Sequence, residues 1–132
     1  CKNLKTVKTY DALKYIRLGT FNNCAKLKMI QLGDNIQHIR ACAFEGCSSL
    51  EEIILPQTIV HISYGIFAKC SNLKKIYSKA MTPPKSPDEV YSYYLCEDAN
   101  VLKNCIIYIP KGRINAYRNA DGWKDFKNIV EE

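Results

Sequence analysis

The sequence predicts a β-rich solenoid in which short parallel strands from successive coils stack at a fixed repeat. The first observation is a 23-residue period shared by five apolar columns. The columns are Cys1, Cys24, Cys47, Cys70; Leu4, Leu27, Leu50, Leu73; Val7, Ile30, Ile53, Ile76; Ile16, Ile39, Ile62; and Phe21, Phe44, Phe67. The second is an alternation of apolar and polar positions within each unit, which is typical of short strands. Because one coil cannot cover its own apolar edge, stacked coils have to supply the core.

Each unit is expected to contain two short extended pieces joined by turns. The unit 47–69 has apolar inward and mostly acidic outward positions: Leu50, Ile53 and Leu55 inward, and Glu51, Glu52 and Ile54 outward. Pro56 then ends the strand, since proline cannot donate to a ladder of hydrogen bonds. A second apolar pair, Ile59 and Ile62, follows, and Phe67 fills the interior.

The repeat pattern divides the chain into two parts. Residues 1–81 hold three full 23-residue units and a partial fourth that begins at Cys70. Because Cys1 already occupies a repeat column, we expect further coils upstream of it. Residues 82–132 are assigned to an expanded last coil and a helical C-terminal cap.

The start of the second part carries helix signals. Pro83 and Pro84 break the repeat pattern, and residues 86–89 read Ser-Pro-Asp-Glu, a capping box with proline at the first helical position. We therefore predict a helix from about residue 87 to 96.

The rest of the second part is expected to close the solenoid. Residues 107–110, Ile-Tyr-Ile-Pro, repeat the pattern of residues 53–56 and predict one last coil. A helix is predicted over 112–121, with Gly122 as its C-cap. Three apolar residues at threefold spacing predict a final helical turn that shields the last coil: Trp123, Phe126 and Ile129.

Of the seven cysteines, the four in the repeat column are interpreted as free thiols. The four in the repeat column would lie about 4.8 Å apart, but parallel Cβ vectors disfavour a disulfide. A straight ladder also offers zinc no tetrahedral set of ligands. Cys42, Cys96 and Cys105 follow no column, and a bridge between Cys96 and Cys105 is left open.

The repeat pattern resembles the BspA-like leucine-rich repeats, the treponemal type of that class. The motif that carries the resemblance is Ala43-Phe44-x-x-Cys47-x-x-Leu50-x-x-Ile53-x-Leu55-Pro56. The tail is similar to the C-terminal cap of these proteins in Bacteroides-type gut bacteria, on the residues Pro83-Pro84, Tyr108-Ile109-Pro110-x-Gly112, Tyr117 and Gly122-Trp123-x-x-Phe126-x-x-Ile129. The resemblance implies a curved parallel-strand solenoid, an extracellular or surface location, ligand binding and no enzyme activity. Arg40 and Ser63 stand where the family often has glycine, and Ile66 replaces an alanine.

No catalytic, cofactor-binding or metal-binding residue is predicted. The sequence has no glycine-rich phosphate loop, no G-x-S-x-G and no H-E-x-x-H. His38 and His61 lie one period apart, preceded in their column by Tyr15, and two imidazoles without a third ligand are interpreted as a solvated column.

The outward strand positions are the candidate ligand-binding surface, because the concave sheet of such a solenoid presents one continuous face. The candidate residues are Lys5, Lys8, Lys28, Gln31, Glu51, Glu52, Lys75 and Tyr77. Lysines around an acidic row favour an acidic or mixed-charge partner, although solvated lysines would also keep a sheet soluble. The second candidate group, Tyr91, Tyr93 and Tyr94, is interpreted mainly as cap packing.

The net charge of +6 raises polyanions as competing partners. The lysines are scattered and arginines number four, which disfavours nucleic acid. No apolar run reaches the roughly 18 residues of a membrane span. The hypothesis is a non-catalytic extracellular adhesion module that binds a host or microbial surface protein. The alternatives are a structural spacer in a larger surface protein and a binder of sulfated glycan.

Overall fold

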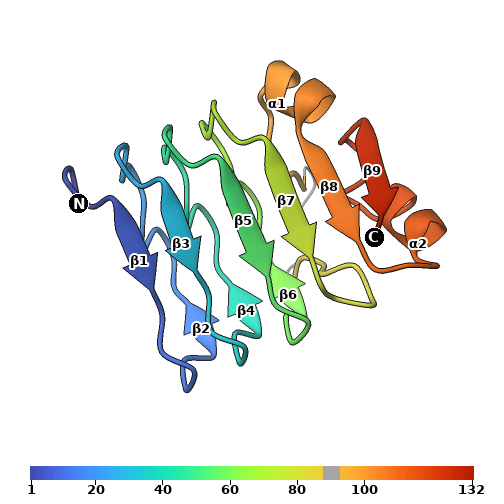
Figure 1. Cartoon of the computed structure of the whole chain (residues 1–132), viewed down its shortest axis with the longest axis horizontal. Helices are drawn as coiled ribbons and strands as arrows, with labels where there is room; N and C mark the ends of the chain where they lie inside the picture. The colour runs from blue at the N-terminus through green and yellow to red at the C-terminus, as the bar shows by residue number, and fades with distance from the viewer. Residues whose placement is uncertain (88–92) are drawn as a thin grey trace.

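The computed structural model describes residues 1–87 and 93–132, which form a stack of coils with two rows of parallel strands (Figure 1). The long strand row contains β1 (Thr6–Lys8), β3 (Met29–Gln31), β5 (Glu52–Leu55), β7 (Lys75–Ser78), β8 (Ile106–Ile109) and β9 (Asn128–Glu131). The short strand row contains β2 (Tyr15–Ile16), β4 (His38–Ile39) and β6 (His61–Ile62). β1 pairs with β3, β5 pairs onward through β7 and β8 to β9, and β3 lies beside β5. The predicted parallel-strand solenoid is confirmed.

The repeat period sets the register of the strands. Val7 lies opposite Ile30, and Ile53 lies opposite Ile76. Ile76 in turn lies opposite Ile107, although their spacing in sequence is longer than one period. The prediction that residues 107–110 form one more coil is therefore correct, and the extra residues are accommodated before β8.

The predicted columns form the core. The inward apolar residues of both strand rows are buried, apart from the half-buried Val7 of β1. Phe44 stacks between Phe21 and Phe67 at ring-centroid distances of 5.7 and 6.2 Å. Each fully buried Leu, Ile or Phe side chain contributes roughly 1.5–3 kcal/mol relative to exposure. Stacking like residues at one period lets each coil bury the apolar edge of its neighbour.

Two turn positions in each of the first three coils adopt left-handed backbone. One set is Gly19, Cys42 and Gly65, with φ of 61°, 55° and 66°, and the other is Asn23, Gly46 and Lys69, with φ of 58°, 75° and 58°. Members of each set are one period apart, so the prediction that Cys42 follows no column was wrong: it occupies a glycine position. The turn glycines belong to these columns and not to the positions of Arg40 and Ser63.

The helix predicted over 87–96 is wrong in its described part, since residues 93–96 are not helical. Residues 88–92, with half of the capping box and Tyr91, lie outside the described residues. The backbone of the described part pairs with the preceding coil instead. The carbonyls of Tyr94 and Leu95 accept hydrogen bonds from the N–H groups of Gly65 and Phe67 at 2.7 and 2.9 Å. A helix begins later instead.

That helix, α1 (Ala99–Asn104), is capped by Asp98. The Asp98 carboxylate accepts hydrogen bonds from the backbone N–H groups of Asn100 and Val101 at 2.9 and 3.2 Å. Such a cap contributes about 1 kcal/mol. The sequence therefore does contain a helix start, but it lies further along the chain than the one that the capping-box pattern indicated.

The second predicted helix is shorter than expected: α2 spans Ile114–Arg118 within the range 112–121. Gly112, with φ of 81°, lies outside the helix, and the backbone N–H of Ile114 donates to the Glu131 carboxylate at 2.9 Å. The C-cap is Asn119 and not the predicted Gly122.

The final segment is a strand and not the predicted helical turn. Trp123 and Phe126 are buried as expected, but Ile129 belongs to β9 and lies opposite Ile107. The physical reason is that β8 would otherwise present an unpaired edge, and β9 satisfies its hydrogen bonds while its inward isoleucine completes the core. β9 and α2 lie together at the C-terminal end of the stack (Figure 1).

The prediction that the four column cysteines are free thiols was wrong at the first coil. Cys1 and Cys24 form a disulfide, with Cα atoms 5.1 Å apart, which is within the normal range. The next thiols in the column turn toward backbone carbonyls instead: Cys47 donates to Phe21 and Cys70 to Phe44, at 3.2 and 3.1 Å. The remaining two buried cysteines, Cys96 and Cys105, are not bridged.

Candidate binding face of the long strand row

The outward side chains of the long strand row form two columns on one surface, which we call the long-row face. The first column contains Thr6, Met29, Glu52, Lys75, Ile106 and Asn128. The second column contains Lys8, Gln31, Ile54, Tyr77, Tyr108 and Val130. Because the pairing is parallel and in register, side chains of adjacent coils lie one strand spacing apart, about 4.8 Å.

The sequence-predicted site residues lie on or beside this face. Five of them occupy the two columns: Lys8, Gln31, Glu52, Lys75 and Tyr77. The other three directly precede β1, β3 and β5 and continue the same register, since the N–H of Lys28 donates to the carbonyl of Lys5 at 2.9 Å. Glu51 forms an exposed ion pair with Lys74 at 3.4 Å, which adds at most about 1 kcal/mol to stability.

The sequence prediction missed the contribution of the last two strands to this face. Tyr77 stacks on Tyr108 with ring centroids 4.7 Å apart and an angle of 11° between the planes. With Ile54 on β5 and Val130 on β9, they make a continuous band of four outward residues, which we call the apolar stripe. Ile54 and Val130 keep 52% and 40% of their surface exposed.

A sequence signal for part of the apolar stripe exists. The correspondence of residues 107–110 with 53–56 makes Tyr108 the equivalent of Ile54, and Ile54 was predicted to face outward. Val130 could be placed only with knowledge that its segment forms a strand.

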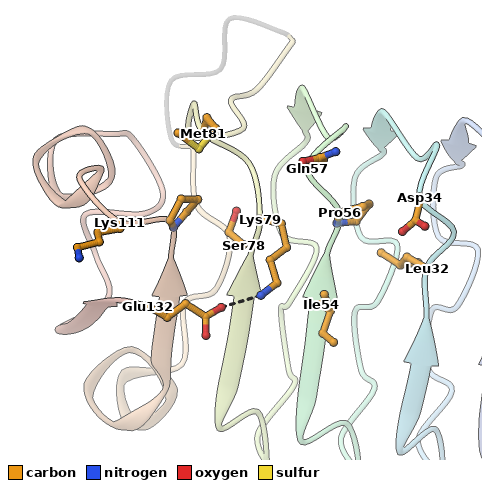
Figure 2. A pocket seen from close by; sticks show the side chains of 11 residues that line it. Leu32, Asp34, Ile54, Pro56, Gln57, Ser78, Lys79, Met81, Lys111 and Glu132 are labelled. Atoms are coloured by element: carbon orange, nitrogen blue, oxygen red, sulfur yellow. Dashed lines mark hydrogen bonds and ion pairs between the residues drawn. The ribbon is translucent and has the colours of Figure 1, made fainter.

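A hollow of about 690 Å³, which we call the rim hollow, lies beside the apolar stripe and shares Ile54 with it (Figure 2). Its walls come from the ends of the long-row strands and the segments after them: Leu32, Asp34, Ile54, Pro56, Gln57, Ser78, Lys79, Met81, Pro110, Lys111 and Glu132. The Lys79 ammonium and the Glu132 carboxylate form an ion pair of 2.7 Å across it, as Figure 2 shows. Lys79 also lies 5.8 Å above the ring of Tyr77, so a cation borders the aromatic pair.

Comparison with known proteins identifies the repeat family of this chain. A family model described as the BspA type leucine rich repeat region matches residues 1–107 in six copies. The chain belongs to this BspA-type repeat family. The resemblance drawn from the motif around Phe44 and Cys47 is thereby confirmed.

A solved structure with the same fold is a leucine rich cell surface protein from Faecalibacterium prausnitzii A2-165, with a TM-score of 0.62 and 20% sequence identity. The match covers 83% of this BspA-type chain but 36% of that protein, so the chain spans about a third of its length. The search of curated proteins gave no match. At this identity the likeness concerns the fold.

The remaining candidate features of this BspA-type domain are metal ligands, membrane spans and the histidine pair, considered within residues 1–87 and 93–132. That part of the chain has no group of three or more His, Cys, Asp or Glu side chains that could hold a metal ion. No helix in the same ranges is long and apolar enough to cross a membrane. The two histidines lie on the short strand row, where the Nδ1 atoms of His38 and His61 are 3.1 Å apart. One ring therefore donates and the other accepts.

The environment of this histidine pair shifts one of its pKa values. Burial lowers the pKa of His38 from its ordinary value of 6.5, and the positive charges of His61 and Arg40 lower it further. His38 is therefore neutral at neutral pH.

Proposed function

We propose that this BspA-type domain is a non-catalytic binding module displayed at the cell surface, and that a protein partner docks on its long-row face. The observation that carries the proposal is the exposed apolar stripe, which runs across four adjacent strands beside the rim hollow. A solenoid needs no apolar side chains on the solvent side of its strands, because its core lies on the other side.

The composition of the face suits a protein partner. Tyr77 and Tyr108 are preorganised by their stacking, and rigid aromatic side chains of this kind dominate the energetics of protein interfaces. Lysines at the N-terminal end of the face, Lys8 and Lys28, add charge that favours an acidic rim on the partner. Support for a surface location comes from the family and from the structural neighbour, which is described as a cell surface protein.

The test is direct binding of the purified domain to a panel of extracellular-matrix and microbial surface proteins by surface plasmon resonance, in a series of salt concentrations. For a partner that binds saturably, Tyr77→Ala removes a central anchor and is expected to weaken affinity about 30-fold, the effect of losing roughly 2 kcal/mol. Lys28→Glu with Lys75→Glu is expected to slow association mainly at low salt.

Tyr15→Ala is the matched control for the aromatic variant. Tyr15 stacks on His38 at a centroid distance of 4.7 Å, so this variant also loses one stacked ring pair, but on the short strand row. Its affinity should equal that of the native domain. Equal losses for Tyr15→Ala and Tyr77→Ala, or no saturable binding across the panel, would contradict the proposal.

A further inference from the structure

The face of the short strand row carries a second ordered set of side chains, separate from the long-row face. Three outward positions repeat over three coils and form a grid: Tyr15, His38, His61; Arg17, Arg40, Ser63; and Leu18, Ala41, Tyr64. Members of each column are one period apart, so the parallel register places them side by side. An arginine column therefore runs between an aromatic column and a mainly apolar one.

The grid encloses a hollow of about 620 Å³, which we call the arginine hollow. Its lining is Tyr15, Arg17, Leu18, Arg40, Ala41, Ser63 and Tyr64. The smallest of these, Ala41 and Ser63, are buried, whereas the larger side chains around them reach solvent. The hollow thus forms because the small side chains of Ala41 and Ser63 are surrounded by larger side chains. Its volume suits a ligand of one or two sugar rings.

Two positive charges line this hollow without a counterion. Arg17 and Arg40 occupy the same position of adjacent coils, and the backbone fixes them, since the N–H of Arg40 donates to the carbonyl of Ile16 at 2.8 Å. Within the described ranges lysine is the cation of every ion pair, and neither Arg17 nor Arg40 has a carboxylate partner. The positive charge of Arg40 also contributes to lowering the pKa of the neighbouring His38.

We propose that the arginine hollow binds an acidic sugar, with its sulfate or carboxylate group held by Arg17 and Arg40. Planar guanidinium groups present paired N–H donors that match the oxygens of such anions, and two of them one strand spacing apart can engage one group together. The side chains of Tyr15 and Tyr64, 48% and 41% accessible, line the hollow and offer apolar carbon atoms to the C–H side of a pyranose ring. Ser63 supplies a hydroxyl for the sugar hydroxyls.

The experiment titrates the purified chain with three disaccharides by isothermal calorimetry: a trisulfated heparin disaccharide, its unsulfated uronate counterpart and neutral lactose. Binding of either acidic disaccharide without binding of lactose is expected, and the comparison of the two identifies sulfate or carboxylate as the recognised group. Amide chemical-shift changes in residues 15–18, 38–41 and 61–64 should accompany binding, with no comparable changes on β7 and β8.

The variant pair separates a specific site from general charge attraction. Arg17→Gln with Arg40→Gln removes two exposed charges and is expected to weaken binding at least about tenfold, because charge-assisted hydrogen bonds are lost. Lys28→Gln with Lys75→Gln removes the same charge from the long-row face and should change affinity by less than about twofold, as screened distant charges do. Unchanged thermal unfolding midpoints check that both variants fold.

Three outcomes would overturn the proposal: binding of neither acidic disaccharide, equal weakening by the two double variants, or shift changes confined to the long-row face. Because the site is on a different face from the proposed protein-binding surface, Tyr77→Ala should bind the acidic sugar normally. Failure of one proposal therefore leaves the other standing.

Discussion

The hydroxyl of Tyr117 is a sensitive point of the C-terminal cap, and its removal has a calculable cost. Tyr117 lies on α2 with no exposed surface, donates a hydrogen bond to the carbonyl of Ala80 at 2.7 Å and shares another of 2.7 Å with the hydroxyl of Ser78. Its ring meets Trp123 edge-on at 5.1 Å. The hydroxyl therefore ties the cap to the end of β7.

Tyr117→Phe keeps the ring and removes both hydrogen bonds. Two buried groups lose their partner, and each costs roughly 1–3 kcal/mol, so we expect a loss of about 2–6 kcal/mol in the free energy of unfolding. For 132 residues the entropy of unfolding is roughly 0.28 kcal/mol/K, which converts this loss to a fall of about 7–21 °C in the unfolding midpoint. Urea titration monitored by circular dichroism, together with thermal scans, measures both quantities.

Tyr108→Phe is the matched control, because Tyr108 is half-buried on the long-row face and its hydroxyl has no hydrogen-bond partner among residues 1–87 and 93–132. Its cost should stay below about 0.5 kcal/mol. Adding Ser78→Ala to Tyr117→Phe should cost less than the sum of the single changes, since the serine hydroxyl is no longer stranded. A loss below about 1 kcal/mol, or one equal to that of Tyr108→Phe, would refute the reasoning.

The other predictions concern the histidine pair, a turn and the thiols. The pKa of His38 is lower in the folded than in the unfolded chain, so the unfolded state binds the proton first and the unfolding midpoint should fall as pH drops below 6.5. His61→Gln should flatten that slope between pH 7.5 and 5.5, and an unchanged slope would contradict the assignment. Gly122→Ala should destabilise the domain to urea by at least about 1–2 kcal/mol, because φ is 80° and a Cβ would lie 2.8 Å from a ring carbon of Tyr93. Thiol titration in denaturant without reductant should find five of the seven cysteines, whereas seven would exclude the disulfide.

The repeats could be predicted from the sequence because the 23-residue period of the chain is also the number of residues in each stacked coil. Stacked coils bring Ile53 beside Ile76 only if the chain uses the same number of residues per coil, so the columns of the sequence become columns of the core. Even the longer coil before β8 was predictable, since the pattern of residues 53–56 recurs intact at 107–110.

The C-terminal part was less predictable because local signals there compete with tertiary ones. The capping box at residues 86–89 indicated a helix, yet Tyr94 and Leu95 are not helical. Their carbonyls instead accept hydrogen bonds from the turn at Gly65 and Phe67. In the same way Ile129 has helical spacing from Phe126, but the open edge of β8 recruits it into a strand. Neither requirement is visible within the segment itself.

The candidate site shows the same division. The outward residues of the repeats, such as Gln31 and Lys75, follow from the period. The apolar stripe depends on β9, and the arginine hollow depends on the shortness of Ala41 and Ser63 relative to their neighbours. A hollow formed by side chains of different size in adjacent coils depends on the three-dimensional packing. The charges and the periodic columns of the sequence do not reveal it.

The spacing of partners along the chain also bears on synthesis of the protein. Hydrogen-bonded coils lie about one repeat apart in sequence, as from Gly46 to Ala68, or somewhat further, as from Ile76 to Ile107, so a coil can dock soon after the ribosome releases the next stretch. At roughly 5–20 residues per second, a coil of this length takes one to a few seconds to emerge. The growing end of the stack stays uncovered during all of that time. The segment with Trp123 and β9 covers the end of the stack at β8, so a ribosome that stalls before residue 123 would hold an apolar, strand-edged surface open to chaperones or to another nascent chain.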